Sequence, residues 1–69
     1  MNHALARMSV TPEEFRRRIK DFRARSGYTQ EECANLMGIP WSTWQRWETG
    51  KSTPRSKMMV NKLMELRII

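Results

Sequence analysis

Signals that begin and end α-helices follow one another closely along this chain of 69 residues. Thr11-Pro12-Glu13-Glu14 places proline at the first helical position and glutamate three residues after a capping threonine, which is a capping box. Thr29-Gln30-Glu31-Glu32 repeats the capping box. Gly27, Gly38 and Gly50 each follow a helical segment and favour a left-handed stop. These signals restrict the chain to short helices separated by tight turns.

Apolar residues within these segments repeat at helical intervals. In the first expected helix they lie four and then three positions apart: Phe15, Ile19 and Phe22. Two further helices are expected over residues 30–37 and 40–49, and Thr53-Pro54 predicts the cap and the first residue of a fourth. No alternating run of β-branched residues indicates a strand. The sequence therefore predicts an all-α fold of four helices, or of five.

Composition narrows the class of protein. Residues 1–10 lack periodicity and are expected to form a flexible N-terminal arm, although Val10 can pack on Phe15; residues 11–69 are expected to form one domain.

The formal net charge of +6 favours an anionic partner. Cys33 is the only cysteine, so no internal disulfide can form. The longest apolar run is too short to span a bilayer and the start resembles no secretion signal, so we expect a cytoplasmic protein.

A glycine-centred turn, Met37-Gly38-Ile39-Pro40, joins the second and third expected helices. Two short helices meeting at a steep angle across such a turn form a helix-turn-helix. The flanking runs are Thr29–Ile39 (TQEECANLMGI) and Trp44–Lys51 (WQRWETGK). These runs, with Pro54 beyond them, resemble the signature of the lambda-repressor/Cro-like (XRE) family, in particular small repressors of phages and mobile elements. The resemblance implies a four-helix DNA-binding domain with a central helix-turn-helix.

The resemblance also implies roles for single residues. In the family an arginine of the first helix pairs with an acid near the end of the third, and the matching residues here are Arg23 and Glu48. The family glutamine that matches Gln30 holds a DNA phosphate. The sequence departs from the family at Pro40, which replaces a Ser or Thr cap, and at Trp41, which replaces a polar residue that contacts bases. Without a capping side chain, the third helix is expected to begin with a tighter turn or to use a neighbouring hydroxyl.

Helical periodicity divides the third helix into two faces. Trp44, Trp47 and Glu48 are expected to face the core. The opposite face carries the candidates for contacts with base edges in the major groove: Trp41, Ser42, Gln45 and Arg46. Glutamine suits adenine, arginine suits guanine and serine is adaptable. For Trp41 the alternatives are packing on thymine methyl groups, packing on sugar, and covering the hydrophobic turn.

Four residues are candidates for contacts with DNA phosphates: Gln30, Thr49, Lys51 and Arg55. Gln30 lies at the amino end of the second helix, where free N–H groups and the helix dipole favour an anion. Thr49 and Lys51 follow the third helix, and Arg55 opens the fourth. The Arg16-Arg17-Arg18 run is expected to be a solvated face that raises the positive potential, and the alternative is that one of its members contacts a phosphate.

Apolar residues near the C-terminal end exceed what a small four-helix core needs. One interpretation is a homodimer interface formed by Val60, Met64, Ile68 and Ile69. The alternative is that these residues close the core of the monomer. A two-fold dimer contacting half-sites about 34 Å apart, one turn of DNA, would gain the selectivity that one helix lacks.

Together these features predict a transcriptional regulator that binds double-stranded DNA. The specific form is a dimeric repressor that recognises an inverted repeat at its own promoter and is associated with the nucleoid when bound. The alternative is an antitoxin or adaptor whose main target is a protein. An enzyme is not expected, because the only histidine, His3, lies in the arm and Cys33 faces the core. No cofactor, metal, membrane partner or small-molecule ligand is expected.

Overall fold

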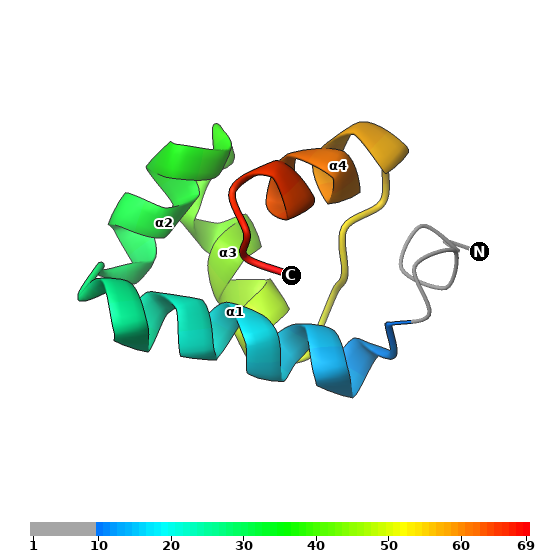
Figure 1. The fold of residues 1–69 in the computed structure, drawn as a ribbon, viewed down its shortest axis with the longest axis horizontal. Coiled ribbons are helices and arrows are strands. Elements are labelled where there is room, and N and C mark those ends of the chain that lie inside the picture. Colours follow the sequence, from blue (N-terminus) through cyan, green and yellow to red (C-terminus); the bar gives the residue numbers. More distant parts are fainter. Residues whose placement is uncertain (1–9) are drawn as a thin grey trace.

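The computed structural model describes residues 10–69 of the chain. These residues form four helices: α1 (Pro12–Ser26), α2 (Gln30–Met37), α3 (Trp41–Glu48) and α4 (Lys57–Glu65). The longest, α1, lies along one edge of the molecule (Figure 1) and packs mainly on α3, while α2 packs on both α3 and α4. No strand occurs within the described residues. The all-α prediction with four helices is therefore confirmed.

The predicted caps of α1 and α2 are present with one difference. At α2, the Thr29 hydroxyl accepts from the Glu32 N–H at 3.1 Å and the Glu32 carboxylate accepts from the Thr29 N–H at 2.8 Å, a complete capping box. At α1, the Thr11 hydroxyl accepts from the Glu14 N–H at 3.1 Å. Both carboxylate oxygens of Glu14 instead accept from Arg17 and Arg18, so only half of that capping box forms.

The start of α3 follows from its proline. Pro40 supplies no side-chain cap, and its carbonyl accepts from the Thr43 N–H at 3.0 Å, which is the shorter spacing of a tighter turn. Of the two starts expected for this helix, a tighter turn or a cap from a neighbouring hydroxyl, the structure has the tighter turn.

The start predicted for α4 is wrong. The helix begins at Lys57, and its cap is Ser56, whose hydroxyl accepts from the Met59 N–H at 3.1 Å. Pro54 is fully buried, and residues 52–55 form a non-helical connection that carries it into the core. Thr11-Pro12 begins α1, whereas Thr53-Pro54, which carries the same local signal, does not begin α4. The two prolines differ in that Pro12 is exposed and Pro54 is buried.

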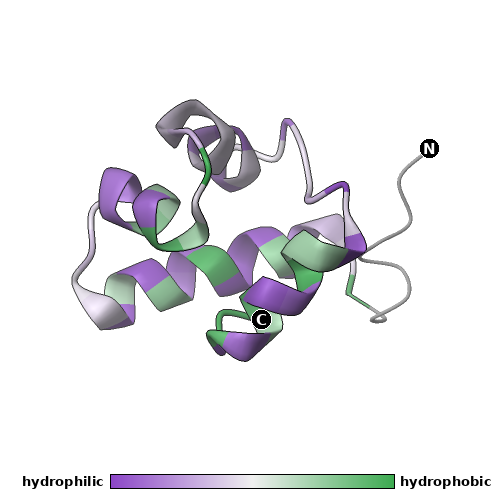
Figure 2. Cartoon of the chain, turned by 90° about the horizontal axis from the view of Figure 1, so that it is seen from above, coloured by the Kyte–Doolittle hydropathy of each residue, from purple (hydrophilic) through white to green (hydrophobic). Residues whose placement is uncertain are grey.

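One hydrophobic core joins all four helices. Its buried members are Val10, Phe15, Ile19, Cys33, Ala34, Met37, Trp44, Trp47, Val60, Leu63 and Ile68. The Phe15 and Trp47 rings meet edge to face with centroids 5.5 Å apart, which locks α1 onto α3. Along α1, hydrophobic and hydrophilic residues alternate as the helix turns (Figure 2). Val10 is buried and so belongs to the folded domain and not to the arm predicted over 1–10; the rest of that arm lies outside the described residues.

The C-terminal residues fold back onto the molecule. After α4, Arg67 adopts a left-handed conformation (φ 59°), and the Ile68 N–H donates to the Leu63 carbonyl at 2.9 Å. The chain end thereby returns towards α1 (Figure 1). Val60 and Ile68 are buried in the core of the chain itself, and Ile69 packs against that core. Val60 and Ile68 therefore follow the alternative in which these residues close the core of the monomer. Ile69 is partly buried and Met64 is exposed, and their place in a dimer interface stays a prediction.

None of the helices over residues 10–69 is long and apolar enough to cross a membrane.

Candidate nucleic-acid interface

The two faces of α3 differ as its periodicity predicts. Trp44, Trp47 and Glu48 are buried. The four predicted base-contacting residues are all exposed on the other face: Trp41, Ser42, Gln45 and Arg46. The structure therefore presents a polar face with one aromatic residue, on a helix whose opposite face is fixed in the core.

Glu48 is the charged residue that fixes this helix. Arg23 donates from Nε and Nη2 to its two oxygens at 2.7 and 3.0 Å, so the pair predicted from the family resemblance is present. The Trp44 indole N–H donates at 2.5 Å, and the Gln30 amide at 3.1 Å. Burial alone would raise the pKa of Glu48, but these hydrogen bonds outweigh it and hold the pKa below the ordinary value. The carboxylate is therefore charged at neutral pH and ties α1, α2 and α3 together.

Gln30 extends this network to the exposed face. Its Nε2 donates to Glu48, and its Oε1 accepts from the Trp41 indole N–H at 3.3 Å. One side-chain amide thus connects the buried carboxylate to the first residue of α3. The orientation of Gln30 is set by both partners, and its second amide hydrogen is left for an external acceptor.

The turn between α2 and α3 has the backbone geometry that its glycine permits. Gly38 has φ 71°, a left-handed conformation that glycine adopts without strain. The Ile39 N–H donates to the Ala34 carbonyl at 3.0 Å, which closes α2 and directs Ile39 against the core. Ala34 is buried where α2 and α3 pack together. The two helices therefore form a rigid helix-turn-helix.

Besides Gln30, three residues that follow α3 are predicted to contact phosphates: Thr49, Lys51 and Arg55. Lys51 and Arg55 are exposed after α3, and Arg55 lines a groove with Arg46 between α3 and the connection to α4. Among the residues that line this groove are two cations and no acid. The Thr49 hydroxyl donates to the Arg46 carbonyl at 3.1 Å. In this arrangement Thr49 closes the end of α3, and its hydroxyl proton is not offered to a phosphate.

Arg16, the first residue of the three-arginine run of α1, is a further cation near this surface, although the sequence does not show which member of that run lies here. Its guanidinium lies beside Gly50, such that a methyl group added to Gly50 would be 3.5 Å from it. Gly50 directly precedes Lys51, so α1 brings a cation to the turn that follows α3. No local pattern could show this, because 34 positions separate the two residues and only the packing of α1 brings them together.

The thiol of Cys33 is not placed to act as a nucleophile. Its side chain is fully buried, and burial raises the pKa of its thiol. His3, the other half of any cysteine–histidine pair, lies outside the described residues.

Comparison with known proteins shows the family to which the chain belongs. A family model described as a helix-turn-helix domain matches residues 14–66, which include α2, α3, α4 and nearly all of α1. No curated protein and no solved structure matches the chain. The helix-turn-helix is a DNA-binding fold in which the second helix of the motif enters the major groove. The matched segment covers most of the chain, and the protein therefore belongs to the family of helix-turn-helix domains.

Proposed function

We propose that this protein is a sequence-specific regulator of transcription that binds double-stranded DNA with α3 lying in the major groove. The observation that carries the proposal is the exposed face of α3, where Ser42, Gln45 and Arg46 point outward while Trp44 and Glu48 anchor the helix behind them. A rigid helix with one free polar face suits the major groove, which is wide enough to admit an α-helix.

Base selection is assigned to three polar side chains. The Gln45 amide can both donate to and accept from an adenine edge, and the Arg46 guanidinium can donate twice to a guanine. Ser42, one position after Trp41, can either donate or accept. Each well-formed bidentate contact discriminates against the wrong base by about 1–3 kcal/mol.

Phosphate binding is assigned to residues around α3. Gln30 lies in the first turn of α2, where its free amide hydrogen and the helix dipole both favour an anion. Lys51, Arg55 and Arg16 supply cations on the side of the turn that follows α3. These contacts supply affinity without sequence information, whereas the three polar side chains of α3 set the preference.

The form of regulator proposed is a dimeric repressor of its own operon, of the kind found in phages and mobile elements. One α3 covers only a few base pairs, and two copies on an inverted repeat supply the missing selectivity. With Val60 and Ile68 buried, Met64 on α4 is the member of the predicted interface that can meet a second copy. Occupancy of the promoter blocks polymerase without any further surface, and the protein works in the cytoplasm on the nucleoid.

A selection experiment tests this function. The protein is incubated with a pool of randomised duplexes at about 100 mM salt, and bound sequences are enriched against nonspecific competitor DNA. We expect an inverted repeat to emerge, bound at least about 10³-fold more tightly than random duplex. Enrichment of no sequence, with competitor displacing every duplex equally, would contradict the proposal.

A substitution pair assigns the roles. Gln45→Ala or Arg46→Ala should relax the preference at particular base pairs of the selected site. Lys51→Ala should instead weaken binding to selected and random duplexes by the same factor. If Lys51→Ala changed sequence preference and the α3 substitutions did not, the groove-facing residues would have been assigned wrongly.

A further inference from the structure

Trp41 is the residue on the exposed face of α3 whose role the sequence left open. It is the first residue of the helix and one full turn before Gln45, so its ring stands on the same line as a base-contacting side chain. About half of its surface (49%) is exposed. Any duplex that receives α3 therefore meets the Trp41 ring.

The hydrogen-bonding capacity of Trp41 is already used inside the protein. An indole has one donor, its N–H, and no acceptor. That N–H donates to Gln30 Oε1 at 3.3 Å, and Gln30 is held in turn by its bond to the buried carboxylate of Glu48. Turning the indole N–H towards a base would break this chain and leave the Gln30 oxygen without its donor. The part of Trp41 that remains for DNA is ring carbon.

We propose that Trp41 recognises the 5-methyl group of a pyrimidine, that is of thymine or of 5-methylcytosine, by contact with its ring. The inference rests on the proposed insertion of α3 into the major groove. Among the base edges displayed there, nitrogen and oxygen donors and acceptors dominate, and the C5-methyl is the apolar group. A carbon surface without a free donor gains from covering that methyl and gains nothing from the polar edges.

The size of the effect follows from the transfer free energy of one methyl-sized group. Burial of such a group contributes about 0.8 kcal/mol, which corresponds to about a fourfold change in affinity for each half-site. This change is smaller than that of a bidentate hydrogen bond. Trp41 therefore acts as a specificity determinant at one position beside those assigned to Gln45 and Arg46.

The experiment replaces methyl groups one at a time. In the duplex obtained by selection, each thymine is changed singly to deoxyuridine, which removes only the 5-methyl and keeps base pairing. Binding of the wild-type protein, Trp41→Ala and Trp41→Phe is then measured by titration. Phe keeps an aromatic carbon surface and lacks the N–H. Thermal melting of each variant verifies folding, which should be intact because Trp41 is exposed.

One thymine in each half-site should stand out. Its change to deoxyuridine should weaken wild-type binding about fourfold, Trp41→Phe should retain most of this sensitivity, and Trp41→Ala should lose it. When a cytosine–guanine pair is placed at the same position, 5-methylcytosine should bind about fourfold more tightly than cytosine, because these two bases differ only in the methyl group.

Two results would overturn this inference and leave the DNA-binding function standing. One is a duplex that is bound selectively but is indifferent to the removal of every methyl group. The other is an equal loss of the methyl preference in Trp41→Phe and Trp41→Ala. If no duplex is selected at all, the proposed function fails and this inference fails with it.

Discussion

Glu48 is the single residue on which the orientation of α3 depends most. It is 5% exposed, and its two oxygens accept hydrogen bonds from Arg23, Trp44 and Gln30. No buried side-chain nitrogen or oxygen among residues 10–69 is without a hydrogen-bond partner. A buried carboxylate satisfied in this way is strongly destabilising to disrupt, since removal of its cationic partner leaves the buried charge uncompensated.

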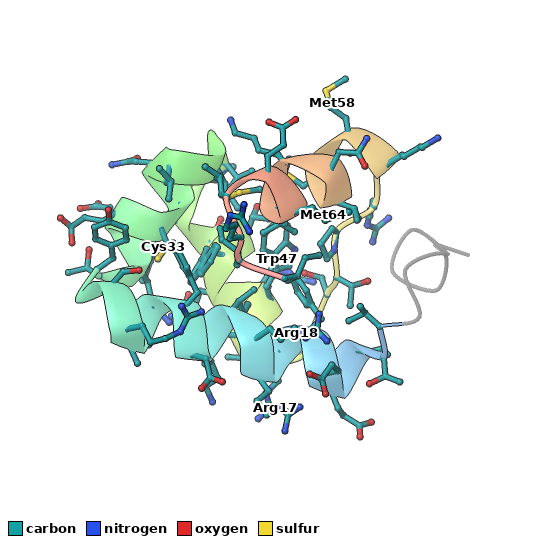
Figure 3. All side chains as sticks on the ribbon, viewed as in Figure 1. Arg17, Arg18, Cys33, Trp47, Met58 and Met64 are labelled. Atoms are coloured by element: carbon teal, nitrogen blue, oxygen red, sulfur yellow. The ribbon has the colours of Figure 1, made fainter. Side chains whose placement is uncertain are left out.

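Arg23→Met is expected to destabilise the protein by about 3 kcal/mol, because it leaves the buried Glu48 charge without its cation. The matched control is Arg17→Met, which breaks the ion pair of Arg17 with Glu14 on the surface of α1 and should cost much less, because water screens an exposed pair. In Figure 3 Arg17 points away from the body of the molecule. Urea unfolding of the two variants measures both values. Equal losses would show that the Glu48 network contributes no more than a surface pair.

Stability should fall in acid through the same residue. The pKa of Glu48 is lowered in the folded protein, so its contribution is complete above the ordinary glutamate pKa of about 4.3 and is lost as pH falls through the lower, folded value. The difference in unfolding free energy between wild type and Glu48→Gln should therefore be constant near neutral pH and shrink below about pH 4. Glu14→Gln is the control at a partly exposed carboxylate. Hydrogen bonds from Arg17 and Arg18 lower the pKa of Glu14 too, so its difference should have the same sign and be smaller, because water screens this site. A difference for Glu48→Gln that grew on acidification would mean that the sign of this pKa shift is wrong.

Among the elements, α4 separates what local signals determine from what packing determines. The sequence predicts the start at Thr53-Pro54, and the structure uses Ser56 as the cap. Ser56→Ala should cost about 1 kcal/mol by removing the cap, whereas Thr53→Ala removes none and should cost less. Thermal unfolding of the two variants compares them. A larger loss for Thr53→Ala would place the start of α4 where the sequence suggested.

The starts and ends of α1, α2 and α3 could be predicted because their caps and stops lie within a few residues of the helices they bound. Thr29 with Glu32 and Gly38 illustrate this for α2. The start of α4 and the return of the C-terminal end could not, since both depend on distant contacts. Ile68 belongs to a core to which all four helices contribute, and Pro54 is buried as well; a one-dimensional pattern does not show which of the apolar residues will be buried.

In the candidate site, too, some features could be predicted from local sequence and others depend on how the helices pack. The faces of α3 follow from a repeat of 3.6 residues, so Gln45 and Arg46 could be placed outward from the sequence. The bond between Trp41 and Gln30 joins residues 11 positions apart across the crossing of α2 and α3. The approach of Arg16 to Gly50 likewise needs the packing of α1. Spacing alone predicts neither contact.

For the whole molecule, the charge distribution predicts strong dependence of DNA binding on salt. Each phosphate neutralised contributes about −0.9 to the slope of log K against log salt concentration on duplex DNA. Lys51→Ala should make this slope shallower by about 0.9. Arg17→Ala removes the same charge from the outer face of α1 and should leave the slope unchanged. Filter binding at a series of salt concentrations measures it, and equal slope changes in the two variants would show that net charge, not position, governs binding.

The proposed association of two copies is assigned to Met64, one of two exposed methionines of α4. Met64 is 41% exposed, and Met58 is 80% exposed and points away from the molecule (Figure 3). Met64 belongs to the predicted interface and Met58 does not, so Met64→Lys should abolish dimerisation and Met58→Lys should preserve it. Sedimentation velocity with and without the selected duplex measures the stoichiometry. A single copy on an inverted repeat at saturating protein would contradict the dimer.

An NMR titration with the selected duplex tests most directly whether the exposed face of α3 enters DNA. Backbone and side-chain N–H resonances are followed as DNA is added, with a scrambled duplex as the control. The largest shifts specific to the selected duplex should occur at Ser42, Gln45 and Arg46, with Gln30 and Lys51 shifting on both duplexes. Shifts centred on the outer faces of α1 or α4, with the exposed face of α3 unchanged, would contradict this mode of binding.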